Sequence, residues 1–388
     1  MKIVYLGAGY VGACSAVVIA KFGHEAFVFD INSERIRAFN TFDREVIESV
    51  LFEQDLGSLV VQNKDRLIFS DNYDEVKKRL SETDVVFICV PTPLRENEGS
   101  YDLSFFNEAV DKLSQAMKER DGGQQKKYVV IVNKSTVSIN MAEAMEEKMT
   151  TAGVINFGVV SNPEFLVEGQ AIRDSFSPDR VVIGATCEKD FTVMRELYQR
   201  FYNSPGVAYL EVNPREAAAG KLLANYILLS RLVSTLDVVG RVSETFPGVA
   251  FEKIRKIITA DRRIGSYGFY NNIYVGGSCL TKDSAALSFQ LEQVGAKAEQ
   301  IKQTLSANIF QRDNFYHRVE QAGFKVNDKI VAVFGLAFKR DTNDVRNSGA
   351  VDIALQLLEG GARQLRVYDP AATAMFKNYF GKKYGEKI

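Results

Sequence analysis

Cys279 stands in the segment GGSCLTKD (276–283), after two glycines and close to a lysine and an aspartate. The pattern predicts a helix just after this cysteine, capped by Thr281, with Lys282 and Asp283 in its first turn. A helix N-terminus and a nearby ammonium both favour thiolate over thiol. A thiolate is a nucleophile, and beside a hydride acceptor it would allow an aldehyde to be oxidised through a thiohemiacetal and a thioester. The alternative is a buried structural cysteine in a glycine-rich turn.

A second candidate site is the turn GAGYVG (7–12), which lies between an apolar strand pattern and a helical pattern. Gly7 permits the tight turn, Gly9 lets a pyrophosphate approach the backbone, and Gly12 lets the helix pack on the strand. Asp30 ends the next predicted strand, where its carboxylate would bind both ribose hydroxyls and repel a 2′-phosphate. The pattern predicts a dinucleotide site that prefers NAD to NADP.

Four further polar residues stand where chemistry could use them. Thr92 in VPTP and Thr136 in NKSTV follow two apolar stretches, at the edge where open α/β sheets bind ligands. They could offer hydroxyls to a cofactor or a water, although turns and helix caps use threonine in the same way. Lys221 and Asn225 are four residues apart on a predicted helix and so lie on one face. Solvation at the surface is the usual fate of such a pair.

The elements that must position these residues alternate between strand and helix from the start of the chain. A helix is expected at 10–22, and buried strands are expected at 2–7, 25–30, 66–70, 84–90, 128–133, 157–161 and 180–185. Such alternation predicts a mostly parallel sheet with helices on both faces. We assign residues 1–212 to an N-terminal, NAD-binding Rossmann domain.

Residues 213–246 are predicted to form one long helix, with Asn213 as N-cap, Pro214 at the first helical position and Glu216 three residues beyond the cap. A helix of this length is expected to link two domains and to bury an apolar face against a partner subunit. It opens a helical dimerisation domain, which we assign to residues 213–325.

The last part of the chain repeats the strand and helix alternation. A strand at 329–338, a helical stretch and a strand at 364–369 make one more βαβ unit. We assign residues 326–388 to a C-terminal Rossmann-like domain. The predicted fold class is therefore α/β, with two Rossmann-like open parallel sheets joined by a long central helix and a helical middle domain.

Composition excludes several classes of protein. The net charge of −1 gives no reason to expect nucleic acid or an anionic membrane as partner. The first residues run straight into the glycine turn, and the apolar runs are shorter than a bilayer span, so we expect a cytoplasmic protein without a membrane segment. The 4 cysteines lack paired spacing and there are only 2 histidines, which favours neither disulfides nor a metal site.

Nine short segments, taken in order, resemble the UDP-glucose/GDP-mannose dehydrogenase family, and most of all its UDP-glucose 6-dehydrogenases. They are GAGYVG (7–12), VPTP (90–93), KSTV (134–137), NPEFLVEGQAIRD (162–174), SPDRVVIG (177–184), KLLAN (221–225), DRRIG (261–265), GGSCLTKD (276–283) and GLAFKRDTNDVRNS (335–348). The resemblance covers nearly the whole chain. The family normally continues well beyond YDP (368–370), so the second sheet is expected to be shortened here.

This resemblance implies an NAD-dependent, four-electron oxidation of UDP-glucose to UDP-glucuronate, as used in polysaccharide biosynthesis. Cys279 resembles the family's covalent nucleophile, which attacks the C6 aldehyde and passes through a thiohemiacetal and a thioester. Lys221 matches the lysine that stabilises oxyanions, and Asn225 matches its hydrogen-bonding companion. Asp283 matches the aspartate that handles a proton or a bound water. Glu164 matches the carboxylate that activates the hydrolytic water, which Thr136 helps to place.

The resemblance also implies binding residues. Those for NAD are Gly7, Gly9, Tyr10, Val11, Gly12, Asp30, Arg35, Thr92, Thr136, Glu168, Lys282 and Arg346. Those for the UDP-sugar substrate are Glu164, Phe165, Leu166, Lys221, Asn225, Arg263, Tyr274, Gly276, Phe338 and Lys339. Arg263 would reach the sugar in the neighbouring subunit, which agrees with a homodimer formed through the central helix. No metal is expected.

Three alternative functions remain open at the level of sequence. The substrate could be another nucleotide sugar, such as a UDP-2-acetamido sugar or GDP-mannose. A two-electron, NAD-dependent hydroxyacid dehydrogenase would also use a lysine and an asparagine on the long helix, but it needs no nucleophilic cysteine. A non-catalytic homologue that binds a nucleotide would have no use for Lys221, Asn225, Cys279 and Asp283 together.

Overall fold

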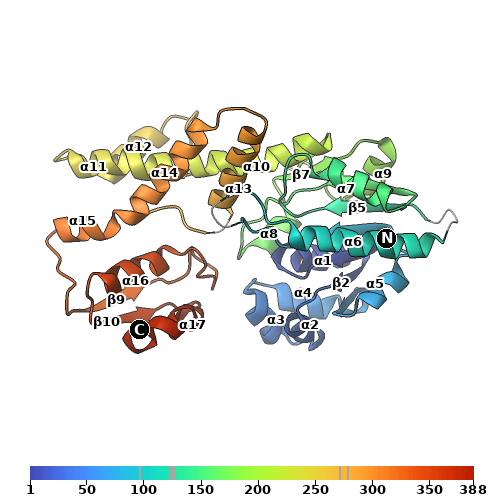
Figure 1. Ribbon diagram of the computed structural model, residues 1–388, viewed down its shortest axis with the longest axis horizontal. Coiled ribbons are helices and arrows are strands. Elements are labelled where there is room, and N and C mark those ends of the chain that lie inside the picture. The colour runs from blue at the N-terminus through green and yellow to red at the C-terminus, as the bar shows by residue number, and fades with distance from the viewer. Residues whose placement is uncertain (96–97, 123–126, 271, 278) are drawn as a thin grey trace. The chain divides into compact units, whose positions relative to one another are not determined.

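The structure is a computed structural model of the 388-residue chain, and it describes residues 1–95, 98–122, 127–270, 272–277 and 279–388. The chain divides into two compact units (Figure 1). The first unit comprises residues 1–96 and 101–221, and the second comprises residues 97–100 and 222–388. The α/β fold class predicted from the sequence is confirmed.

Within the described residues, the first unit is built on an eight-stranded sheet in the order β3-β2-β1-β4-β5-β6-β7-β8. Its strands are β1 (Lys2–Leu6), β2 (Glu25–Phe29), β3 (Leu67–Ser70), β4 (Val85–Ile88), β5 (Val129–Asn133), β6 (Phe157–Ser161), β7 (Arg180–Gly184) and β8 (Ala208–Val212). Neighbouring strands run parallel, except that β6 and β7 meet antiparallel. Strand β8 was not predicted from the sequence.

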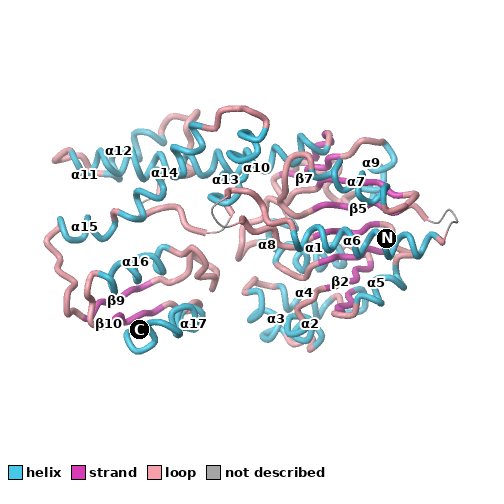
Figure 2. Tube along the Cα trace, viewed as in Figure 1, coloured by secondary structure: helices cyan, strands magenta, loops and turns pink. Residues whose placement is uncertain are grey.

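Helices cover both faces of this sheet (Figure 2), which explains why β4 and β5 are buried along their whole length. One apolar core packs α1 (Tyr10–Lys21), α2 (Ser33–Asn40), α3 (Arg44–Leu51), α4 (Leu56–Gln62), α8 (Ala171–Phe176) and α9 (Glu188–Leu197) against one face. The other core packs α5 (Tyr73–Arg79), α6 (Ser104–Asp121) and α7 (Met141–Thr151) against the opposite face.

The predicted long helix is present, with one irregularity. It runs as α10 (Pro214–Ser234), a π-helical turn at Thr235–Gly240, and α11 (Arg241–Thr245). Its N-terminus carries the expected reciprocal cap. The Asn213 side chain accepts a hydrogen bond from the Glu216 N–H at 2.9 Å, and the Glu216 carboxylate accepts one from the Asn213 N–H at 2.8 Å.

By length and composition, the stretch Pro214–Thr245 could cross a membrane, since its most apolar window has a mean hydropathy of 1.5. Such a helix also occurs as a core or interface helix in water-soluble proteins. Of that window, 39% is buried within the protein.

The second unit contains a helical part and a small α/β part. The helical part includes α12 (Phe251–Thr259), α13 (Leu280–Gln293), α14 (Glu299–Asp313) and α15 (Phe315–Gln321). The α/β part consists of β9 (Ile330–Phe334), α16 (Gly349–Glu359), β10 (Gln364–Tyr368) and α17 (Thr373–Tyr384). Strands β9 and β10 form a parallel pair, so among the described residues the second sheet is short, as expected. Its core contains Leu357 and Phe376.

Candidate active site

The glycine turn has the shape that a dinucleotide site needs. Gly7 has a φ of +111°, and a side chain on it would come within 2.5 Å of the Cys89 carbonyl oxygen. A side chain on Gly12 would come within 1.9 Å of the Gly7 carbonyl oxygen, because α1 packs closely on the turn. Gly9, in contrast, has no atom within 4 Å of where a Cβ would lie. The turn is therefore closed on the protein side and open at Gly9, where a pyrophosphate would approach.

Asp30 lies directly after β2, as predicted, and its buried carboxylate braces the glycine turn. It accepts hydrogen bonds from the Ala8 N–H at 2.6 Å and the Asn32 N–H at 2.8 Å. The Arg35 guanidinium pairs with the same carboxylate at 3.1 Å. Tyr10, in the first turn of α1, donates a hydrogen bond to the Phe52 carbonyl at 3.2 Å. These residues fit an NAD site.

The two predicted threonines lie together in the first unit. The Thr92 hydroxyl donates a hydrogen bond to the Thr136 carbonyl at 2.6 Å. They are adjacent because β4 and β5 are parallel neighbours, so the segments that follow these strands leave the sheet at the same edge.

Lys221 and Glu164 form a buried ion pair, which sequence spacing could not reveal. The Lys221 Nζ lies 3.0 Å from Glu164 Oε1, with the two side chains 7% and 16% exposed. The other carboxylate oxygen accepts a hydrogen bond from the Leu166 N–H at 2.7 Å. The Phe165 ring lies between two cations, with Lys221 Nζ 5.3 Å and the Arg180 guanidinium 3.7 Å from its centroid. These contacts order Glu164, Phe165 and Leu166, which the sequence assigns to substrate binding.

Three residues of this site were missed from the sequence. The buried Lys134 ammonium donates a hydrogen bond to Asn162 Oδ1 at 3.0 Å, and the Tyr198 hydroxyl donates to the same oxygen at 2.8 Å. Burial is the main cause that lowers the pKa of Lys134, and the charge of Glu164 only partly opposes it. The available signal was a lysine directly after an apolar strand.

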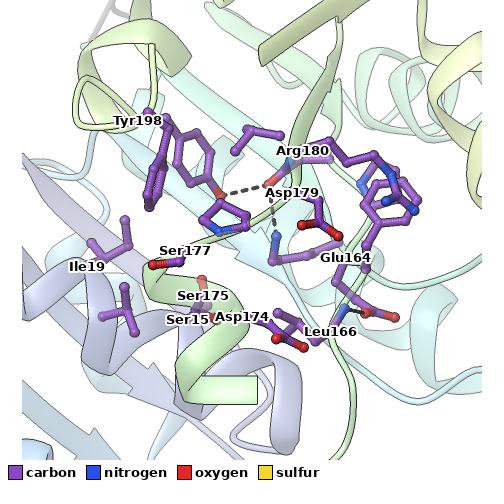
Figure 3. A pocket seen from close by; sticks show the side chains of 18 of the residues that line it. Ser15, Ile19, Glu164, Leu166, Asp174, Ser175, Ser177, Asp179, Arg180 and Tyr198 are labelled. Atoms are coloured by element: carbon purple, nitrogen blue, oxygen red, sulfur yellow. Dashed lines mark hydrogen bonds between the residues drawn. The ribbon is translucent and has the colours of Figure 1, made fainter. Parts of the chain in front are cut away.

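These residues line a cavity of about 180 Å³ in the first unit (Figure 3). Its wall is formed by α1, by residues from 162–167 and 174–181, and by Tyr198. Glu164 and Asp174 contribute carboxylates, and Lys134 contributes an ammonium. Most of the cavity wall is apolar, and these charged groups are polar partners that a water in the cavity would find.

A second buried cluster lies in the second unit, around Asp283. This carboxylate is 1% exposed, accepts a hydrogen bond from Asn225 Nδ2 at 2.6 Å, and pairs with Lys282 Nζ at 2.9 Å. The Asp283 N–H also donates to the Cys279 carbonyl at 2.9 Å. Asn225 is one helical turn from Lys221 on α10, so the same helix carries a member of each buried cluster.

Cys279 is exposed and is itself the N-cap residue of α13, so the predicted Thr281 cap is wrong. The backbone of Cys279 is already near helical, with φ −93° and ψ −57°, and the helix begins at Leu280. The Thr281 hydroxyl instead donates to the Gly277 carbonyl at 3.5 Å. Of the segment NNIYVGGSCLTKD, Asn271 and Ser278 lie outside the described residues.

The glycines before Cys279 pack against the chain itself. A side chain on Gly276 would come within 2.6 Å of the Asn347 carbonyl oxygen, and one on Gly277 would come within 2.9 Å of the Phe338 ring. Tyr274 is buried, and its hydroxyl donates to Asp352. Burial, together with that hydrogen bond, raises the pKa of Tyr274. These contacts join the segment before Cys279 to the α/β part of the second unit.

The remaining predicted residues have simpler settings. Arg263 pairs with Asp261 at 2.6 Å, with 89% of its side chain exposed. Arg346 binds Asp344 at 2.6 Å, with 65% of its side chain exposed. Val11 lies in the first turn of α1, Lys339 Nζ lies 5.7 Å from the Phe338 ring centroid, and Glu168 is half-buried. Within the described residues, no cluster of His, Cys, Asp and Glu side chains could hold a metal ion.

Comparisons with known proteins agree across the chain. Models of the UDP-glucose/GDP-mannose dehydrogenase family match residues 1–202 as an NAD binding domain, 215–309 as a central domain and 332–387 as a UDP binding domain. The chain is 33% identical to UDP-glucose 6-dehydrogenase 1 of Glycine max and 34% identical to UDP-glucose 6-dehydrogenase 2 of Arabidopsis thaliana. Each alignment covers 96% of this chain and 76% of the relative.

A solved structure gives the same result in three dimensions. The UDP-glucose dehydrogenase of the archaeon Pyrobaculum islandicum superposes with a TM-score of 0.87 at 30% identity. The superposition covers 98% of this chain and 84% of that one.

Proposed function

The chain belongs to the UDP-glucose/GDP-mannose dehydrogenase family and uses NAD, and from this membership we propose that it oxidises UDP-glucose to UDP-glucuronate. The observation that carries the proposal is the exposed Cys279 at the start of α13, in the same unit as the buried cluster of Asn225, Lys282 and Asp283. A two-electron oxidation needs no such nucleophile.

The proposed reaction converts the C6 alcohol into a carboxylate and consumes one water. Each NAD, when bound, accepts one hydride from the substrate carbon, and two are used for each sugar. Three protons are released in the complete reaction at neutral pH. The protein must therefore supply a proton acceptor for the alcohol, a nucleophile for the aldehyde and a base for the water.

In the first oxidation, the C6 hydroxyl loses its proton as the hydride leaves. We assign the proton to Asp283, directly or through a water. The neighbouring Lys282 ammonium and the Asn225 amide already bind this carboxylate and hold its orientation. Lys221 and Asn225 then stabilise the negative charge that develops on the C6 oxygen, an effect worth about 3 kcal/mol for one well-placed donor.

In the second oxidation, the Cys279 thiolate attacks the aldehyde carbon and forms a C–S bond. The thiol proton has been released when the thiolate forms, so the adduct is the alkoxide of a thiohemiacetal, and loss of a hydride converts it into a thioester. The position of Cys279 at the N-terminus of α13, with Lys282 in the first turn of that helix, supports the thiolate form. Retaining the aldehyde as a covalent adduct also prevents its release between the two oxidations.

In the last step, water hydrolyses the thioester, breaks the C–S bond and returns the thiol. Glu164 acts as the base for this water, with Thr136 as a positioning group. Two observations support this assignment: Glu164 is held by Lys221 and by the Leu166 N–H, and it lines the cavity of the first unit. Lys221 again stabilises the oxyanion of the tetrahedral intermediate.

The residues assigned to cofactor binding are those of the glycine turn and its edge, namely Gly7, Gly9, Tyr10, Val11, Gly12, Asp30, Arg35, Thr92 and Thr136, together with Glu168, Lys282 and Arg346. We assign substrate contacts to Phe165, Leu166, Arg263, Gly276, Phe338 and Lys339. Tyr274 contributes by supporting the loop before Cys279, because its hydroxyl is held by Asp352.

We also propose a cytoplasmic homodimer that pairs through the long helix. Leu223 and Ile227 of α10 and Val238 of the π-helical turn are 49%, 54% and 58% exposed. Exposed apolar rows of this kind mark protein interfaces. The same helix buries Lys221 and Asn225, which a lipid-facing span would rarely carry.

The proposal is tested by the yield of NADH per UDP-glucose consumed. The purified parent is expected to give two NADH for each sugar, and Cys279→Ser is expected to lose steady turnover. Far-UV circular dichroism and NADH binding show whether the variant is folded. UDP-2-acetamido sugars and GDP-mannose are assayed in parallel, to establish which nucleotide sugar is preferred.

Each other outcome contradicts part of the proposal. One NADH per substrate, with Cys279→Ser fully active, would indicate a two-electron dehydrogenase. Binding of nucleotide without any NADH would indicate a non-catalytic homologue. Faster turnover of a different nucleotide sugar would keep the chemistry and replace the substrate.

A further inference from the structure

Glu53 is a buried carboxylate that the proposed reaction does not use. It lies between α3 and α4 and is 2% exposed. Its Oε1 accepts a hydrogen bond from the Ile172 N–H at 3.0 Å, whereas Oε2 is buried and has no hydrogen-bond partner among the described residues. Burial raises the pKa of Glu53, and the backbone N–H groups of residues 169, 171 and 172 oppose this only in part.

The backbone around Glu53 is also unusual. Phe52 and Asp55 have φ values of +46° and +66°, in the left-handed region that side chains disfavour. The carbonyl of Phe52 accepts the hydrogen bond from Tyr10, in the glycine turn. Two consecutive residues therefore contact two predicted binding segments. The Phe52 carbonyl binds the glycine turn (7–12), and the Glu53 carboxylate binds the end of residues 162–172, called the substrate segment below. Backbone strain that persists at such a junction is typical of functional positions.

The substrate segment, residues 162–172, depends on such anchors because residues 162–170 lead from β6 to α8 without regular structure and only its last two residues belong to α8. Glu164 binds the N–H of Leu166, and Asp174 binds the N–H of Val167 at 2.9 Å. Both are local. Glu53 lies 119 residues away from Ile172, so its bond fixes the far end of the segment to a different part of the unit.

We propose that Phe52 and Glu53 are positioning residues that couple the cofactor turn to the substrate segment, so that NADH binding strengthens binding of the nucleotide sugar. The proposal rests on the function proposed above. A ligand that orders the turn fixes Tyr10, and thereby the strained Phe52, the neighbouring Glu53 and the end of the segment that carries Glu164 and Glu168. Coupling of this kind is reciprocal, so the sugar nucleotide must strengthen NADH binding by the same factor.

A purely structural role for Glu53 predicts that Glu53→Gln melts at a lower temperature than the parent, whereas the raised pKa of Glu53 predicts that it does not. The pKa of Glu53 is raised in the folded state, so the native protein holds this proton more tightly than the unfolded chain does. The free energy of unfolding therefore falls as the pH rises from the ordinary glutamate pKa of 4.5 to the higher pKa of the folded state. At neutral pH the charge on Glu53 therefore lowers stability. Glu53→Gln, which keeps an acceptor for the Ile172 N–H but removes the charge, should melt no lower than the parent.

The experiment measures the dissociation constant of UDP-glucose by calorimetry, without and with saturating NADH, which cannot turn over. In the parent we expect NADH to tighten UDP-glucose binding by about tenfold. In Glu53→Gln and in Tyr10→Phe this factor should fall below about threefold, and the double variant should lose no more than either single one. Glu45→Gln, at an exposed site on α3, is the matched control and should keep the parent factor.

A second measurement does not depend on the sugar. Hydrogen exchange is followed at residues 168–172 after addition of NADH alone. Protection should increase in the parent and in Glu45→Gln, but not in Glu53→Gln. If UDP-glucose fails to bind with or without NADH, the proposed substrate is wrong, and the exchange result still decides the coupling.

Two results would overturn the coupling. One is an unchanged dissociation constant and unchanged exchange when NADH is added to the parent. The other is a Glu53→Gln variant that melts several degrees lower and keeps the full coupling factor, which would show that Glu53 only stabilises the fold.

Discussion

At the scale of single residues, the proposed chemistry depends on charged groups that lie mostly buried beside a partner. Lys221 and Glu164 bind each other, and Asp283 is bound by Asn225 and Lys282. Each charged group also has a fixed hydrogen-bond geometry, which is what a catalytic group needs before the substrate arrives. Burial makes each partner depend on the other, since an isolated buried charge is strongly unfavourable.

This dependence predicts the behaviour of Lys221→Met. The variant leaves the mostly buried Glu164 without its ammonium, so the free energy of unfolding should fall by about 3 kcal/mol, measured by urea denaturation. Turnover should fall by at least about 100-fold. Adding Glu164→Gln should restore much of the stability but none of the activity.

The matched control is Lys148→Met, because Lys148 pairs with Asp111 at 2.8 Å on the surface. Its effect should stay within about 0.5 kcal/mol, as is usual for exposed pairs. An equal loss of stability in Lys148→Met and Lys221→Met would show that the buried pair has no special importance.

At the scale of elements, two glycines between β1 and α1 have different roles. Gly12 is required by the fold, because α1 lies against the Gly7 carbonyl, and Gly9 is required only if a ligand approaches. The start of the long helix is also determined locally, because Asn213 and Glu216 cap each other as the sequence predicts. In both elements, residues only a few positions apart settle the geometry.

The two glycines should therefore respond differently to alanine. Gly9→Ala adds a methyl group where the protein has open space, so thermal stability should stay close to that of the parent while NADH affinity falls by about tenfold or more. Gly12→Ala places a methyl group 1.9 Å from a carbonyl oxygen, so the melting temperature should drop clearly. Differential scanning fluorimetry and NADH fluorescence check both. Equal NADH affinity in Gly9→Ala and the parent would contradict the assigned pyrophosphate position.

At the scale of the whole molecule, the long helix carries apolar residues on both its buried and its exposed face. Leu222 and Leu229 are fully buried, whereas Leu223 and Ile227 are about half exposed. A helix with apolar residues on its outer face leaves a surface that water solvates poorly, and a second copy of the chain would cover it. The proposed homodimer removes that exposure.

We expect Ile227→Glu to convert the dimer into a monomer, since it places a charge in the centre of this apolar row. Sedimentation velocity at micromolar concentration measures the change. Val294→Glu is the matched control, because Val294 is 79% exposed at the end of α13 and lies outside the row. A parent that sediments as a monomer, or an Ile227→Glu variant that stays dimeric, would contradict the proposed interface.

Local patterns in the sequence determined much of this protein. Apolar runs and the glycine turn predicted β1 to β7, α1 and Asp30 at the end of β2, and N-cap chemistry predicted the start of α10. The glycine turn and Asp30 predicted the NAD cofactor, and the family segments agreed. Each of these features is a pattern of residue types along the chain, so the chain need not be folded for it to be recognised. Strand β8 was not predicted because its residues, Ala208–Val212, are mostly half-exposed and form no apolar run.

The tertiary structure alone decided which polar groups meet. Lys134 binds Asn162, Lys221 binds Glu164, and Glu53 binds Ile172, in each case across many residues of chain. It also gave the N-cap position to Cys279 rather than to a threonine. The physical reason is that a buried charge is stable only beside its partner, and that partner is brought near by the packing of whole elements, which no local spacing encodes.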